Sequence, residues 1–63
     1  MSTHKPPLLA DIEEYLERKR MAPSTFGREA ISNPSIVGRI RKDPLSITLR
    51  TAVRLRQYMD DNP

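Results

Sequence analysis

The chain of 63 residues contains no cysteine, one histidine and two glycines. Without cysteine it can form neither a disulfide nor a thiolate metal site, and a single histidine provides no imidazole cluster for a metal. Two glycines are too few for a glycine-rich loop that wraps a phosphate group. We therefore expect no bound metal ion and no cofactor.

Long apolar runs are also missing. No stretch approaches the ~18 apolar residues of a membrane span, and residues 1–7 lack the apolar centre of a signal peptide. We expect a cytoplasmic, nucleoid-associated protein without membrane contact. A chain of this length forms one small domain at most, which is too small to enclose a typical substrate pocket. Since its glutamates at 13, 14 and 17 are typical of a solvated helix face, we expect no enzyme activity.

Positive charge is concentrated in the middle of the chain. The net charge is +3, whereas residues 18–56 contain ten basic and two acidic residues. The other acidic residues lie before and after this segment. This distribution is typical of a protein that presents one face to a polyanion, although a solvated and balanced surface has the same composition.

Proline positions and apolar spacing predict an all-α fold of four to five short helices, because no segment alternates as a strand would. Asn33 is expected to cap the third helix, with Pro34 at its first position, so that three or fewer residues separate it from the second. Residues 43–46 are expected to form a loop, and Thr48 is expected to cap the last helix. The expected elements are a flexible arm at 1–6 and helices at 7–20, 23–31, 34–42 and about 49–60, in one domain over residues 7–60.

Each expected helix has an apolar face that would form the core. The residues expected to be buried together are Phe26, Val37, Ile40 and Leu55. The residues expected on the inner side of the last helix are Leu49, Ala52, Leu55 and Met59, with Val53 beside them. Leu45, in the loop before that helix, is expected to fold back onto the core.

Residues 22–43 resemble the helix-turn-helix of the lambda-repressor-like (Cro/CI/XRE) family. Phe26 stands at the position of the large apolar residue of the family's second helix. Two short helices that meet at a sharp turn need small residues where their backbones approach, and Gly27 and Ala30 supply them. Val37 and Ile40 occupy the two buried positions of the recognition helix. The similarity covers residues 9–59 with degenerate motif positions, and the turn at 32–34 departs from the family's usual sequence.

The resemblance implies a sequence-specific, double-stranded DNA-binding transcription regulator, Cro-like and typical of bacteria or phages. Helix 34–42 would read the major groove. Relatives often bind as two-fold dimers, so a homodimer formed on DNA is one implication. The apolar residues considered for that contact are Leu45, Ile47, Tyr58 and Met59.

The residues expected to face base edges lie on the recognition helix. Arg39 and Ser35 are one turn apart, and an arginine there could contact guanine O6 and N7. Gly38 would allow close approach of the backbone, and Pro34 replaces a side chain that many relatives use for reading. A solvated arginine, a serine in a first helical turn and a tolerated glycine are the simpler interpretations.

A second group of residues is expected to face DNA phosphates. The candidates are Ser24, Thr25, Asn33, Arg41 and Lys42, with His4 and Lys5 as arm contacts. Hydroxyls and free N–H groups at a helix start suit phosphate oxygens. Helix capping, pairing with the helix dipole and a disordered terminus explain the same residues without DNA.

Two other functions fit the same sequence. A helix-turn-helix can serve as an adaptor that contacts RNA polymerase or another regulator, and an antitoxin-like protein would pair with a toxin while contacting DNA. Salt-dependent binding to random duplex DNA would separate a DNA-binding protein from a pure adaptor.

Overall fold

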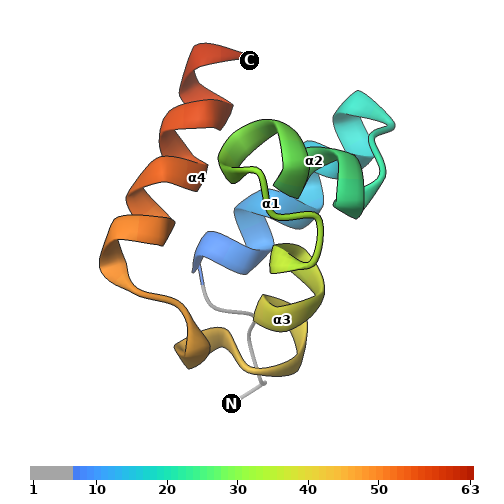
Figure 1. The fold of residues 1–63 in the computed structure, drawn as a ribbon. Coiled ribbons are helices and arrows are strands. Elements are labelled where there is room, and N and C mark those ends of the chain that lie inside the picture. The colour runs from blue at the N-terminus through green and yellow to red at the C-terminus, as the bar shows by residue number, and fades with distance from the viewer. Residues whose placement is uncertain (1–6) are drawn as a thin grey trace.

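The computed structural model describes residues 7–63, and this part of the chain is helical without any strand, which confirms the all-α fold. The elements are α1 (Pro7–Lys19), α2 (Pro23–Ile31), α3 (Ile36–Lys42), the 3-10 helix η1 (Pro44–Ser46) and α4 (Leu49–Asp61). In Figure 1, α2 lies in front of α1, α3 lies below α2, and α4 stands to their left. The arm expected at 1–6, with His4 and Lys5, lies outside the described residues.

The core takes side chains from all four α-helices. The buried apolar residues are Leu9, Ile12, Tyr15, Leu16, Phe26, Ile36, Val37, Ile40 and Leu55. This set includes the four residues that the sequence predicts to be buried together. One helix cannot bury its apolar face alone, so this shared core is what holds the short helices in place.

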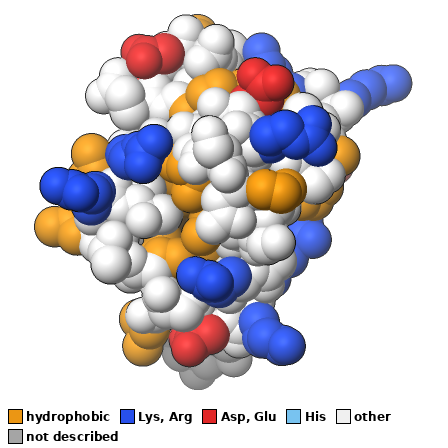
Figure 2. Space-filling model, in the orientation of Figure 1, with side chains coloured by type: hydrophobic (Ala, Val, Ile, Leu, Met, Phe, Trp, Pro, Cys, Tyr) orange, Lys and Arg blue, Asp and Glu red, His pale blue; other side chains and the backbone are white. Residues whose placement is uncertain are grey.

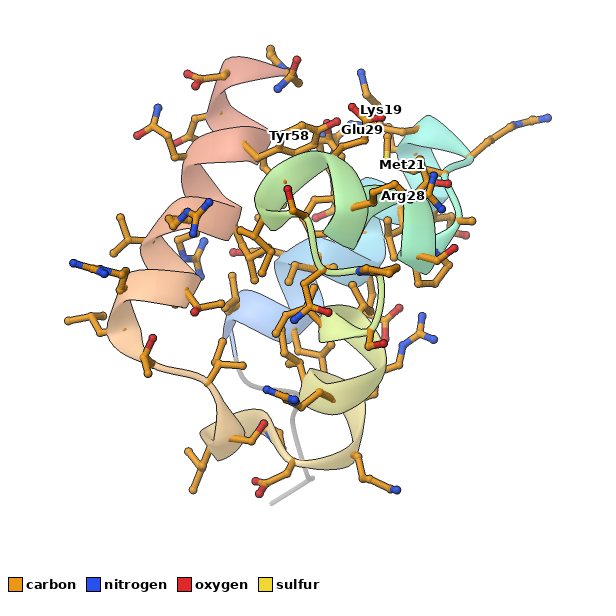
Figure 3. The ribbon with its side chains drawn as sticks, in the orientation of Figure 1. Lys19, Met21, Arg28, Glu29 and Tyr58 are labelled. Atoms are coloured by element: carbon orange, nitrogen blue, oxygen red, sulfur yellow. The ribbon has the colours of Figure 1, made fainter. Side chains whose placement is uncertain are left out.

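Aromatic rings connect α1, α2 and α4. The Phe26 ring centroid lies 5.6 Å from that of Tyr15 and 5.5 Å from that of Tyr58. Tyr58 extends from α4 towards α2 (Figure 3). The Tyr15 hydroxyl also donates a hydrogen bond of 2.6 Å to the carbonyl oxygen of Asn62, directly after α4. Residues at opposite ends of the chain are therefore joined around Phe26.

The predicted start of the third helix is wrong by two residues. Residues 32–35, four rather than three or fewer, separate α2 from α3, because Pro34 and Ser35 form a turn. The Ser35 N–H donates to Oδ1 of Asn33 at 3.0 Å, and the Ile36 N–H donates to the Asn33 carbonyl oxygen at 3.2 Å. Asn33 therefore caps this turn, while regular α-helical bonding begins after it.

Gly27 allows α2 to approach the turn that follows it. A Cβ atom at this position would collide with the Asn33 carbonyl oxygen and would lie 2.9 Å from Cγ2 of Ile36. The backbone oxygen cannot move away without shifting the turn. The expected reason for a small residue here is therefore confirmed.

Two predictions about the apolar residues near α4 are wrong. Leu49 and Val53 are 80% and 55% exposed, and Leu45 in η1 is 92% exposed instead of folding back onto the core. Leu55 is the buried residue of α4, and it lies six positions after Leu49, about 240° around the helix axis. Packing Leu55 inward therefore turns Leu49 outward. Thr48 caps α4 as expected, since its Oγ1 accepts from the Thr51 N–H at 3.2 Å.

The 3-10 helix replaces the loop expected after α3. Asp43 Oδ1 accepts the Leu45 N–H at 3.2 Å and so caps η1, which begins at Pro44. Proline is well suited to this first position because its missing N–H has no helical partner. The chain therefore passes from α3 to α4 through an ordered turn that keeps Leu45 at the surface.

Candidate nucleic-acid interface

The outer face of α3 brings together most of the residues predicted to contact bases. Ser35, Gly38, Arg39 and Lys42 are exposed, whereas Ile36, Val37 and Ile40 are buried. The spacing of the exposed residues, at positions i, i+3, i+4 and i+7, places them on one side of a helix. Ile36, the first residue of α3, belongs to the core and is not part of this face.

Gly38 lies open in the middle of this face. A Cβ atom added there would meet no heavy atom within 4 Å, in contrast to Gly27. Its backbone is α-helical and it has no positive φ angle. Neither packing nor backbone conformation therefore requires a glycine at this position.

The phosphate candidates at the start of α2 have no capping role. The N-cap is Ala22, whose side chain offers no hydrogen bond, and Ser24 is exposed while Thr25 is half-buried. The first-turn N–H groups of α2 therefore have no side-chain acceptor. Asn33 is different, because its Oδ1 already accepts the Ser35 N–H.

Arg41 forms an ion pair within the protein. Its Nε and Nη2 donate to the two carboxylate oxygens of Glu13 in α1, at 2.8 and 2.7 Å. The hydrogen bond from the guanidinium to Glu13 raises the pKa of Arg41. The Arg41 side chain is directed at α1 rather than at the outer face of α3, whereas its neighbour Lys42 forms no ion pair with any described residue.

Five exposed cations of α2, α3 and α4 form no ion pair within residues 7–63. They are Arg28, Arg39, Lys42, Arg50 and Arg54. Figure 2 shows Lys and Arg side chains spread over one face of the molecule, with acidic side chains near its upper and lower margins. Figure 3 shows Arg28 and Glu29 on α2. We call these five cations and the outer face of α3 the basic face.

Two acidic residues of α1 form ion pairs with arginines of α3 and α4. Besides the Glu13–Arg41 pair, Asp11 accepts a hydrogen bond of 2.8 Å from Nη1 of Arg56 in α4. The partners are 28 and 45 residues apart in the chain. No local sequence signal indicates these pairs, because only the packing of α1 against α3 and α4 brings them together.

Residues 7–63 contain no group of three or more metal-ligating side chains and no helix long and apolar enough to cross a membrane. No protein-family model, curated protein or solved structure matches the chain.

Proposed function

We propose that the protein binds double-stranded DNA in a sequence-specific manner and regulates transcription, with the outer face of α3 in the major groove. The groove is about 12 Å wide and accepts one α-helix. The exposed residues of α3 combine a long cation, a hydroxyl and a bare backbone position. These are groups that read base edges or allow a helix to approach them.

The cations of α2 and α3 have different roles in this proposal. Arg39 reads a base edge, where its two-pronged guanidinium matches guanine O6 and N7. Lys42, Arg28 and the free N–H groups at the start of α2 contact phosphates, which position the helix but do not identify the sequence. Arg41 joins α3 to α1 through its ion pair with Glu13, so it contributes less to DNA binding.

Gly38 is the observation that carries this proposal. A glycine within a helix costs up to about 1 kcal/mol of folding stability relative to alanine. The fold gains nothing in return, since a Cβ atom at this position would touch nothing. A ligand surface that approaches the α3 backbone between Ser35 and Arg39 accounts for the absence of a side chain.

The substitution Gly38→Ala tests this explanation. We expect the free energy of unfolding to rise by about 0.5–1 kcal/mol, because alanine restricts the unfolded chain and favours the helix. Binding to a duplex selected from a random pool should weaken by about tenfold, equivalent to about 1.4 kcal/mol. Urea denaturation and titration of a labelled duplex measure the two effects.

Gly27→Ala is the matched control for the effect on stability. The same substitution at this packed position should destabilise the fold by about 1–3 kcal/mol through overpacking. Unchanged DNA binding in a stabilised Gly38→Ala variant would contradict the proposal. A protein adaptor would show no salt-dependent binding to duplex DNA at all.

A further inference from the structure

An apolar patch lies on the outer side of α4, away from the core. Leu49 and Val53 are four residues apart on one face of the helix, and Leu45 is exposed on η1, which leads into it. These three are the exposed large hydrophobic residues of the described chain. Single apolar residues at a surface are ordinary, but two on one helix face with a third on the adjoining element indicate a contact surface. We call Leu45, Leu49 and Val53 the α4 patch.

Arginines border the α4 patch on both sides. Arg50 and Arg54 each follow a patch residue by one position, about 100° around the helix, and neither forms an ion pair with a described residue. Arg56 comes seven residues after Leu49, which brings it about 20° to the other side of that residue. Its Nη1 donates to Asp11 at 2.8 Å, yet its side chain stays 46% exposed. Over α4, at the left of Figure 2, apolar side chains lie next to Lys and Arg side chains.

No acidic residue stands among these arginines. Residues 44–59, which cover η1 and most of α4, contain three arginines and no aspartate or glutamate. The nearest acidic residue before them is Asp43, and the nearest after them are Asp60 and Asp61. Asp60 lies on the same face as Val53, but two turns further on. The patch therefore combines apolar area with positive charge at both edges, and negative charge begins only at the end of the helix.

We propose that the α4 patch binds an acidic, amphipathic helix of a different protein. The apolar stripe of that helix packs on Leu49 and Val53, as surface helices do through apolar residues one turn apart. Aspartates or glutamates on both sides of the stripe meet Arg50, Arg54 and Arg56. These opposite charges select the partner, while the apolar contacts hold it.

Neither a second copy of the chain nor DNA matches this surface as well. Both edges of the patch are basic, so that contact with its own copy brings arginine against arginine in either orientation of the two helices. A duplex offers negative charge along its backbone but no apolar surface there to cover Leu45, Leu49 and Val53. An acidic amphipathic helix supplies both properties. The inference does not depend on the proposed function, because α3 is no part of the patch.

A selection from a random library of helix-forming peptides tests the chemistry of the partner. The wild type is the target, and the double variant Leu49→Ser/Val53→Ser removes peptides that bind elsewhere. We expect the enriched peptides to carry apolar residues at helical spacing, with aspartate and glutamate in excess over lysine and arginine. The substituted side chains are exposed, so the melting temperature of the variant should change little. No enrichment, or enrichment without an acidic excess, would overturn the proposal.

The affinity of one enriched peptide, synthesised by itself, tests the role of the arginines. Arg50→Gln/Arg54→Gln should weaken its binding by about tenfold at low salt and by less at high salt, because exposed charge pairs are screened. Arg28→Gln/Lys42→Gln is the matched control, since it removes the same charge from α2 and α3. Equal losses in the two variants would show a response to net charge alone and would overturn the assignment to α4.

The other two occupants are tested with the same variants. We expect the wild type to sediment as a monomer, and we expect wild type and Leu49→Ser/Val53→Ser to bind random duplex DNA equally. The apolar control Leu49→Met/Val53→Ile should keep the affinity for the peptide. A wild-type dimer that the serine variant loses would assign the patch to a second copy, and weaker duplex binding by that variant would assign it to DNA. Either result would overturn the proposal.

Discussion

At the scale of single residues, the proposed function makes Arg39 the residue that discriminates between DNA sequences. It is exposed on the outer face of α3, without an ion pair to any described residue, so its guanidinium is available to a base. We expect Arg39→Ala to cost about 1–3 kcal/mol on the selected duplex and to relax the preference at one base pair, a G·C pair. Competition between selected and scrambled duplexes at fixed salt measures this loss.

Arg28→Ala is the matched control for Arg39, because Arg28 is exposed on α2 and lies on the same basic face. It should weaken binding to selected and scrambled duplexes alike. Equal losses on both duplexes for Arg39→Ala would make Arg39 a phosphate contact instead. No loss on either duplex would favour the adaptor function.

The raised pKa of Tyr15 predicts how the free energy of unfolding changes at alkaline pH. Burial raises the pKa of Tyr15 above its usual 10.0, the neighbouring Tyr58 adds to this increase, and Arg18 opposes it. The unfolded chain therefore loses this proton first as the pH rises. The stabilising contribution is complete below pH 10 and is lost as the pH rises through the folded-state pKa.

Tyr15→Phe should remove part of this alkaline loss. The variant also loses the hydrogen bond to the Asn62 carbonyl, which costs about 1 kcal/mol at neutral pH. We therefore expect a lower but flatter curve of unfolding free energy between about pH 8 and pH 11. Urea denaturation at a series of pH values gives both curves. Parallel curves for the two proteins would show that Tyr15 does not carry the effect.

At the scale of helices, the two cations at the end of α3 have different surroundings. Lys42 is exposed without an ion pair among the described residues, whereas Arg41 is held by Glu13. Lys42→Ala should reduce the slope of log affinity against log salt by about 1 on every duplex. Arg41→Ala should change this slope less, because its charge is already partly neutralised by the carboxylate.

The Arg41–Glu13 pair should instead contribute to the free energy of unfolding, because it joins α1 to α3. The side chains are 46% and 23% exposed, so the pair contributes at most about 1 kcal/mol. A double-mutant cycle with Arg41→Ala and Glu13→Gln should give a coupling energy within that limit. An undiminished salt slope in Lys42→Ala, with a reduced one in Arg41→Ala, would reverse the two assignments.

At the scale of the whole molecule, stability depends on a core with Phe26 at its centre. Phe26 is 0% exposed and contacts the rings of Tyr15 and Tyr58 from two other helices. Phe26→Ala should cost about 3–5 kcal/mol, which is most of the stability that a small domain possesses. Thermal unfolding followed by circular dichroism measures this loss.

Leu49→Ala is the control for Phe26, since Leu49 is 80% exposed and its truncation should change stability by no more than about 0.5 kcal/mol. A Phe26→Ala variant that melts within a few degrees of the wild type would contradict the position of this residue in the core.

Several parts of the fold can be predicted from the sequence because local chemistry determines them. Pro23 marks the start of α2, and Thr48 caps α4, both as predicted. The spacing of Phe26, Val37 and Ile40 also identifies buried positions, since helical periodicity alone places them on inner faces. These features depend on neighbours within a few residues.

The tertiary structure decided the features that depend on distant neighbours. The α4 sequence has apolar residues on more than one side, and only the packing of Leu55 against the other helices selects which side is buried. The start of α3 depends on a turn held against Gly27, and the partner of Arg41 lies 28 residues away in α1. Periodicity cannot rank two competing helix faces or pair distant charges, because both are settled by the free energy of the assembled core.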